Sequence, residues 1–190
     1  MKIQTKRIIA GLGLAAGLVA ASNVSAETAT INASVVVDGS LNVSVLSPLD
    51  YGTIAAIGHG VDVATLTISS DPAVAPAAVN TANAKIIIIV DGTPADVLVS
   101  NAAPMYALTV TPPAATTATD PSTVSAHTFD VDNFSMYAHT EGNSQTFGTT
   151  TDATGNLGFN IGADLITDTA VVGAYDNTTY TSTFDYTINY

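Results

Sequence analysis

The chain has 190 residues, with 16 Asp and Glu against four Lys and Arg, no Cys, and a hydrophobic content of 47%. This apolar content is enough to fill the core of one domain, so the acidic balance does not indicate a disordered chain. Nucleic-acid binding is excluded because it depends on clustered Lys and Arg. The absence of Cys excludes disulfides and a lipid anchor on Cys.

The chain begins with the pattern of a secretion signal. Three cations precede an apolar stretch at residues 8–21, and small residues ending at Ala26 follow it. This order is typical of an exported protein that is cleaved after the small residues. The apolar stretch is shorter than the roughly 18 residues needed to cross a bilayer. We therefore expect residues 1–26 to be a bacterial signal peptide, and residues 27–190 to be exported and not to be an integral membrane protein.

Removal of the signal would change the charge of the chain. It would leave Lys85 as the only Lys or Arg against all 16 Asp and Glu, a formal charge of −15. Nucleic acid and anionic lipid both repel such a surface. We expect neither as a partner, and we expect the exported domain to depend on packing and strand pairing alone for its stability.

The rest of the chain is predicted to be all-β. Runs rich in Val, Ile, Thr and Tyr recur between Gly, Pro, Asn and Asp clusters, and no segment keeps helical apolar spacing for three turns. Two stretches poor in such signals, residues 71–83 and 114–125, are predicted to be long surface loops of one domain, a linker between two domains being the alternative. The predicted strands are residues 29–37, 41–46, 61–69, 85–90, 95–100, 105–111, 128–134, 158–161 and 179–190, and turn residues separate them at 38–39, 91–94, 112–113 and 176–177.

Both outermost predicted strands alternate between apolar and polar residues. Alternation with a period of two places one apolar face on each strand. In the last strand that face carries Phe184, Tyr186, Ile188 and Tyr190, and in the first strand it carries Ile31, Ala33, Val35 and Val37.

Strands at the ends of a chain are expected at sheet edges, where their N–H and C=O groups can pair with another molecule. If residues 28–37 of one copy complete the sheet of the next copy beside its last strand, the head-to-tail contact builds a filament. This predicts a structural subunit of a bacterial surface polymer whose partners are copies of itself. The alternative is that both strands pair inside one closed monomer, which would be a secreted or surface module that binds a ligand or adheres, with or without calcium.

The strand predicted at residues 85–90 lacks alternation, since Ile86 to Val90 are all apolar. A strand with apolar side chains on both faces is typical of the centre of a buried sheet, which is our prediction. The alternative is that its second face meets another subunit.

No catalytic motif is present, and we expect no enzyme and no cofactor. His59, His127 and His139 are scattered along the sequence, which favours solvated surface side chains over a catalytic or metal-binding trio. Residues 130–141 begin like a calcium loop, but the fifth and sixth positions lack the required oxygen ligand and Gly. Asp130 and Asp132 are therefore predicted to lie on the polar face of a strand, and they are the candidates if calcium is bound.

Several short motifs resemble those of a secreted bacterial family, the domain of unknown function 4402. They are Leu49-Asp50-Tyr51-Gly52-Thr53-Ile54, Val131-Asp132-Asn133-Phe134, Asp152-Ala153-Thr154-Gly155, Ile161-Gly162-Ala163-Asp164-Leu165, and Gly173-Ala174-Tyr175 followed by Tyr186-Thr187-Ile188-Asn189-Tyr190. The likeness covers almost all of residues 27–190, although residues 176–179 interrupt the expected approach to the last strand.

This resemblance implies an immunoglobulin-like antiparallel β-sandwich without an established activity. The Asp-Tyr-Gly-Thr motif and the tyrosine-ended last strand are also similar to spore-coat-U type subunits of chaperone-usher pili, which polymerise by donating an N-terminal strand. That similarity implies a periplasmic chaperone and an outer-membrane usher as further partners, and a location outside the cell reached through the periplasm. The disulfide common in those subunits is absent from this chain.

Overall fold

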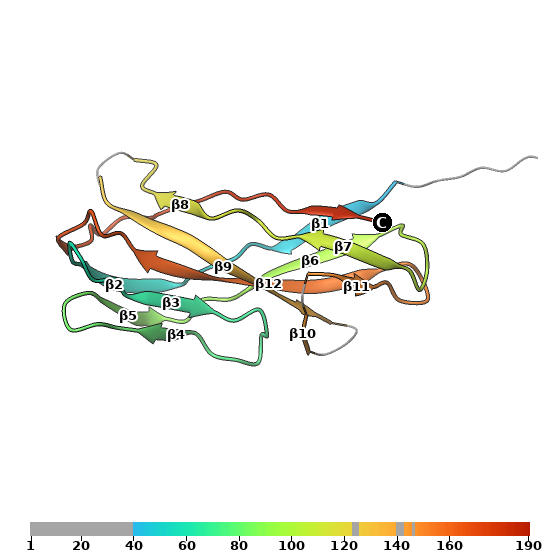
Figure 1. Cartoon of the computed structure of the whole chain (residues 1–190), viewed down its shortest axis with the longest axis horizontal. Coiled ribbons are helices and arrows are strands. Elements are labelled where there is room, and N and C mark those ends of the chain that lie inside the picture. Colours follow the sequence, from blue (N-terminus) through green and yellow to red (C-terminus); the bar gives the residue numbers. More distant parts are fainter. Residues whose placement is uncertain (1–39, 123–125, 140–142, 146) are drawn as a thin grey trace, which may run out of the picture. The chain divides into compact units, whose positions relative to one another are not determined.

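The computed structural model describes residues 40–122, 126–139, 143–145 and 147–190. Within these ranges the chain is all-β and its strands pair antiparallel, so the predicted antiparallel β-sandwich is confirmed (Figure 1). None of the described residues forms a helix that is long and apolar enough to cross a membrane. The predicted signal at 1–26 and the predicted first strand at 29–37 lie outside the described residues.

The largest sheet is built around β12 (Leu157–Thr167). One edge of β12 pairs with β9 (Thr128–Ala138), and the other edge pairs first with β6 (Ala95–Ser100) and then with β3 (Thr65–Ile68). Four more strands extend this sheet outward, namely β1 (Asn42–Ser47) on β6, β4 (Ala77–Val79) on β3, and both β8 (Thr116–Thr119) and β10 (Asn143–Gln145) on β9.

Two sheets of three strands complete the fold. One has the order β11 (Thr149–Thr150), β7 (Ala107–Thr111) and β14 (Thr187–Asn189), and the other has the order β13 (Gly173–Ala174), β2 (Thr53–Gly58) and β5 (Lys85–Val90). Each sheet contributes buried side chains to a different apolar cluster. The sheet of β13, β2 and β5 contributes Ala56 and Ile86 to the cluster that we call the first core. The sheet of β11, β7 and β14 contributes Leu108 and Val110 to the cluster that we call the second core.

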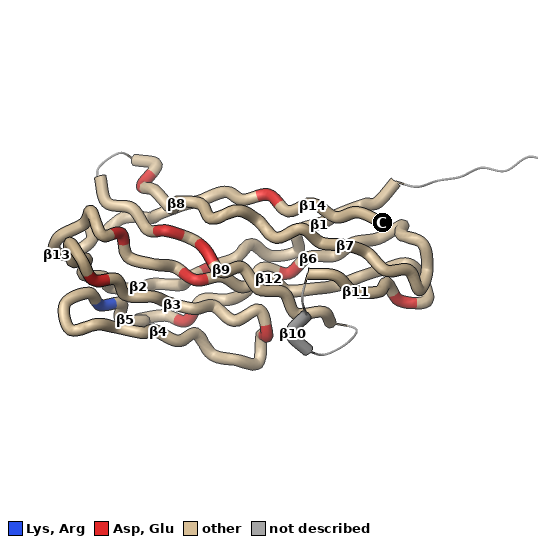
Figure 2. The backbone as a smooth tube through the Cα atoms, in the orientation of Figure 1, with Lys and Arg blue, Asp and Glu red and all other residues tan. Residues whose placement is uncertain are grey.

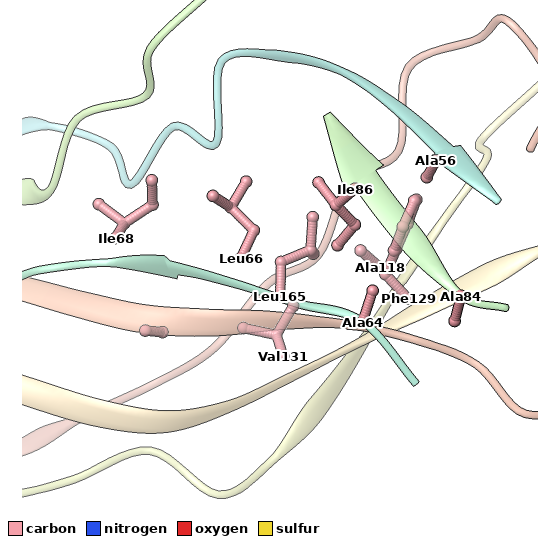
Figure 3. Packing of buried hydrophobic residues seen from close by; sticks show 11 residues of the cluster. Ala56, Ala64, Leu66, Ile68, Ala84, Ile86, Ala118, Phe129, Val131 and Leu165 are labelled. Atoms are coloured by element: carbon pink, nitrogen blue, oxygen red, sulfur yellow. The ribbon is translucent and has the colours of Figure 1, made fainter. Parts of the chain in front are cut away.

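The inner face of β12 contributes to both cores. Leu157, Phe159 and Ile161 belong to the second core, which β6, β7 and the end of β9 also fill. Ala163 and Leu165 continue the same alternation into the first core, where Leu165 lies near Leu66 and Val131 (Figure 3). Because side chains two residues apart share one face of a strand, one uninterrupted alternation is enough to serve both clusters.

A β-bulge in β9 keeps the apolar side chains of both halves of the strand directed toward the cores. Val131 packs in the first core and Met136 in the second, although five residues of a regular strand would place them on opposite faces. The pairing with β12 shifts between Gly162 and Asp164, and Asn133 takes a positive φ of 53°. Asn is among the residues that accept this conformation, and the extra residue restores the inward direction.

Several strand predictions need correction. The predicted strands do not include β2, β4, β8, β10, β11 or β13. Of these, β4 and β8 lie within residues 71–83 and 114–125, predicted above to be loops. β4 pairs along three residues of β3, and β8 pairs along four residues of β9. Tertiary pairing therefore makes short strands in segments where frequent Ala and Pro weaken the local strand signal. β9 and β12 are also longer than predicted, because Asn133 and Gly162 do not end the strands that contain them.

The prediction for β5 as a strand buried on both faces is wrong. Its boundaries are those predicted, but Ile87 and Ile89 are 57% and 63% exposed, while Ile86 is buried in the first core. β5 pairs only with β2 in a ladder, so it is an outer strand of its sheet and one of its faces points away from the core.

Gly162 offers a test of the junction between the cores. A methyl group at this position would overlap backbone atoms of Ile68, Ser69 and Ser70, where β3 ends beside β12. We expect Gly162→Ala to lower the free energy of unfolding by about 1–3 kcal/mol, because backbone cannot rotate away as a side chain can. Thermal or urea unfolding measures the change. Gly60→Ala is the control, since its methyl group would meet only ordinary contacts, and an equal loss in both variants would contradict the argument.

Candidate functional site

Strand pairing forms a series that has two open ends. The series runs from β1 through β6, β12 and β9 to β8, and an antiparallel bridge between Thr119 and Thr181 adds the C-terminal segment, residues 181–190. Within the described part of the chain, no second strand pairs with β1 or with the outer side of the C-terminal segment. The two ends are therefore sheet edges.

The C-terminal segment pairs with its neighbour only at its two ends. Ladder pairing covers Thr187–Asn189 opposite β7, and the next bridge is at Thr181. Between these points the neighbouring chain contains Pro112 and Pro113, which have no N–H group to donate. The alternation predicted at 179–190 is present, but the hydrogen-bonded strand is Thr187–Asn189, much shorter than predicted.

The predicted apolar face of the C-terminal segment does point toward the cores. The ring of Phe184 lies 4.9 Å from that of Phe134, and the ring of Tyr186 lies 6.0 Å from that of Phe159. Ile188 packs against the second core. These three side chains are only half-buried, and Tyr190 is exposed with its ring 5.5 Å from that of Tyr106.

The hydroxyl group of Tyr186 is buried without a hydrogen-bond partner among the described residues. Burial raises the pKa of Tyr186 because the phenolate form is poorly solvated there. An unpaired buried hydroxyl destabilises the fold by about 1–3 kcal/mol relative to a bonded one. The Tyr186 hydroxyl is therefore an unsatisfied polar group at this edge.

The opposite end of the series, β1, exposes side chains that face the core. Val45 lies directly opposite Val97, and Val43 opposite Val99. Residues opposite each other share one face of a sheet, and Val97 is fully buried. Val45 nevertheless is 61% exposed, because no described strand covers it. Leu46, at the bulge that follows, is exposed to a similar extent.

We call the two edges together the open seam. It is formed by Val43, Val45 and Leu46 of β1 on one side and by Phe184, Tyr186 and Ile188 of the C-terminal segment on the other. Leu41, just before β1, packs against the second core as Tyr186 and Ile188 do. In the view of Figure 1, β1 (cyan) and the C-terminal strand (red) overlap in projection. The seam is an incomplete part of the core boundary.

Half of this site is recognisable from the sequence, because the C-terminal residues alternate over a long predicted strand. Val43 and Val45 are not recognisable as site residues, since they alternate with polar residues within a predicted strand as ordinary core residues do. The predicted donor residues Ile31, Ala33, Val35 and Val37 lie outside the described residues.

The three histidines each contact a different Asp. His59 lies 3.6 Å from Asp62, His127 lies 3.5 Å from Asp176, and His139 lies 3.7 Å from Asp96. The ring of His139 is also 2.6 Å from the amide oxygen of Asn160. Over the described ranges, no three His, Asp or Glu side chains come together as a metal site would require.

Asp96 and Asn160 also line a hollow with a volume of about 560 Å³. Its walls come mainly from residues 72–76 and 91–94, which include three prolines. A volume of this size falls within the range of small-molecule sites. The hollow is open to solvent and combines carboxylate, amide and apolar groups.

Asp130 and Asp132 lie on the outer face of β9, as predicted. Both are exposed, and they line a small hollow of about 230 Å³ with Thr116, Thr117 and Ile166. Asp132 lies directly opposite Asp164 of β12, whose carboxylate accepts hydrogen bonds from Thr67 and Asn133. Figure 2 shows these acidic positions gathered where β9 and β12 pair.

Other motif residues have structural roles. Gly52 has a positive φ of 75° and its backbone N–H donates to the Asp50 carboxylate, at a point where backbone from residues 90–92 passes closely. The Asp152 carboxylate accepts bonds from the backbone of Asn156 and Thr154, which lowers its pKa. The Tyr175 hydroxyl donates to the Thr128 carbonyl, and burial raises the pKa of Tyr175 to about 12.

Comparison with known proteins gives no relatives: no family model, no curated protein and no solved structure matches this chain.

The pair of Asp132 and Asp164 provides a test for a bound cation. Like charges directly opposite on a sheet repel each other, so we expect Asp132→Asn to raise the free energy of unfolding by up to about 1 kcal/mol at low salt. The gain should shrink at high salt, where exposed charges are screened. Urea unfolding with and without calcium at equal ionic strength measures both effects. Stabilisation of the unsubstituted chain by calcium, lost in Asp132→Asn, would instead indicate a cation held between these carboxylates.

Proposed function

We propose that this protein is an exported structural subunit of a bacterial surface filament, assembled when residues 28–37 of one copy enter the open seam of the next. The observation that carries the proposal is the pair of unpartnered edges whose core-facing apolar side chains remain exposed. An added strand would pair with the C-terminal segment and cover Val43 and Val45 of β1. The function needs no cofactor and no catalytic group.

The donor and the seam match in length and pattern. Residues 28–37 and 181–190 each comprise ten residues, which extend about 33 Å as strands. Ile31, Ala33, Val35 and Val37 alternate, so all four would face the seam together. Burying the exposed half of a Val or Leu side chain in the seam contributes roughly 1 kcal/mol, and several such side chains act together.

Donation between copies yields an open chain of subunits. The donor segment and the seam are different surfaces, so the contact is heterologous and does not close on itself. A chain without Cys gains a continuous hydrogen-bonded ladder at each junction in place of a disulfide. The exposed seam before assembly is an aggregation hazard, which supports the expected periplasmic chaperone and outer-membrane usher as partners.

A second candidate function is a monomeric secreted module that binds a ligand or adheres. The hollow lined by Asp96 and Asn160 favours it, because its volume suits a small molecule. In this arrangement residues 28–37 would fold back within the same copy, since Asp38-Gly39 is a hairpin signal between them and β1. Filament assembly depends on protein concentration and on the open seam, whereas a closed monomer depends on neither.

Paired variants test strand donation. Ile31→Asp places a charge on the donor face, and Val45→Asp places one on the seam. Each should abolish filaments in electron micrographs and leave monomers in sedimentation velocity, since an unpaired charge is strongly disfavoured in a buried interface. An equimolar mixture of the two should form dimers but no longer species, because only one intact donor and one intact seam remain for each pair.

The controls change the opposite faces of the same strands. Asn32→Asp on the donor and Asn42→Asp on β1 should polymerise normally, because Asn42 points away from the core and Asn32 belongs to the polar face of the predicted donor strand. Normal filaments from Ile31→Asp, or monomers at every concentration of the unsubstituted chain, would overturn the proposal and favour the closed monomer.

A further inference from the structure

Two exposed tyrosines lie edge to face where the C-terminal segment meets β7. The ring centroids of Tyr106 and Tyr190 are 5.5 Å apart, with an angle of 72° between the ring planes. Tyr106 is 51% exposed and Tyr190 is 50% exposed. Two phenol rings that are close together and open to solvent meet the geometric requirement for oxidative coupling, in which both rings must lose an electron and then reach each other.

The backbone on both sides of this pair is fixed. The Tyr106 N–H donates a hydrogen bond of 2.9 Å to the hydroxyl of the buried Thr151, and the Tyr106 carbonyl accepts one of 2.9 Å from the Thr151 N–H. On the other side, Asn189 pairs with Thr109 in the ladder between β14 and β7, directly before Tyr190. The two rings are therefore held near each other, while rotation of exposed side chains on the ps–ns timescale lets their edges meet.

A second pair of tyrosines, Tyr175 and Tyr180, has ring centroids 6.0 Å apart but is less exposed. Tyr175 stacks on Phe129 with a centroid distance of 4.1 Å. Its hydroxyl donates to the Thr128 carbonyl and accepts a hydrogen bond from the Asp168 N–H. Burial raises the pKa of Tyr175 to about 12, so little of the readily oxidised phenolate forms at neutral pH. This pair is therefore an internal comparison, close in space but protected.

We propose that Tyr106 and Tyr190 form an oxidative cross-linking site, at which an oxidant of the haem peroxidase class joins the two rings through their ortho carbons. Each phenol loses one electron and one proton and becomes a phenoxyl radical. The two radicals combine in one carbon–carbon bond, and each ortho hydrogen then moves as a proton to its phenolic oxygen. Hydrogen peroxide takes up the two electrons and two protons through the peroxidase and leaves as two water molecules.

The cross-link would hold the C-terminal segment against β7. That segment is paired with its neighbours only at its two ends, and the chain has no Cys from which a disulfide could form. A bond between Tyr106 and Tyr190 closes a loop of residues 106–190, and a link across a long loop restricts the unfolded chain strongly. The bond would thus give the stability that exported domains commonly obtain from disulfides. This proposal does not rest on strand donation.

The experiment uses the exported chain carrying Ile31→Asp, so that strand donation is blocked, at low protein concentration with a peroxidase and limiting hydrogen peroxide. Mass spectrometry should show a monomer that has lost two hydrogens, and digestion at Asp should yield one linked peptide that contains Tyr106 and Tyr190. Oxidation of the exposed Met105 adds an oxygen instead, so the mass separates this side reaction from coupling. Thermal unfolding of the linked monomer should have a midpoint about 5–15 °C above that of the untreated chain.

Variants that remove one hydroxyl group identify the site. Tyr106→Phe and Tyr190→Phe should each abolish the cross-link and the rise of the unfolding midpoint, because Phe keeps the ring but cannot form a phenoxyl radical. Tyr180→Phe, the matched control in the protected pair, should leave the yield of the cross-link unchanged. Circular dichroism confirms that each variant is folded before treatment.

Several results would overturn the proposal. A cross-link that persists in Tyr106→Phe, or one that forms only between copies as a covalent dimer, would contradict the assignment of the site. So would a chain that stays unlinked while free N-acetyltyrosine couples in the same solution. An unchanged unfolding midpoint of the linked monomer would contradict the stabilising role. Loss of filaments in Ile31→Asp reports on donation alone, so the two proposals fail separately.

Discussion

The structure depends on β12, whose inner side chains take part in two cores in succession. Because Leu157, Phe159, Ile161, Ala163 and Leu165 share one face, every neighbouring strand must keep its apolar side chains on that face over the same length. β9 meets this constraint with the bulge at Asn133, and the opposite edge of β12 meets it by changing partners at Gly162. Both adjustments occur at the same level, where the first core gives way to the second.

The same constraint accounts for the open seam. Two cores are fully covered only if paired strands surround them without a break. The series of paired strands stops at β1 and at the C-terminal segment, so the cores are incompletely covered there. Backbone pairing along that last segment is further weakened opposite Pro112 and Pro113, so its position depends on Phe184, Tyr186 and Ile188 packing inward. By contrast, the β5 edge is capped by Asn80. The free edge of β5 is thus protected against pairing, as natural sheets commonly protect their edges, whereas no second described strand pairs with β1.

Charge divides the surface in a corresponding way. Carboxylates gather where β9 and β12 pair and at several loops, and each histidine contacts its own Asp. The six apolar side chains of the open seam include no carboxylate, and Asp185 lies on the opposite, exposed face of its segment. Mutual repulsion between acidic copies is therefore weakest at the open seam, where the proposed strand donation would bring two copies together.

The sequence by itself determined the all-β class, the exact extent of β5 and β6, and the inward face of the C-terminal segment, because period-two alternation and turn residues are local signals. Only the tertiary structure decided which apolar residues remain uncovered. Val45 and Val97 look alike in sequence, yet one is exposed and the other buried, since burial depends on whether a strand distant in the chain lies above them. For the same reason the apolar run of β5 suggested a central strand, whereas its place at the border of a small sheet leaves Ile87 and Ile89 in solvent.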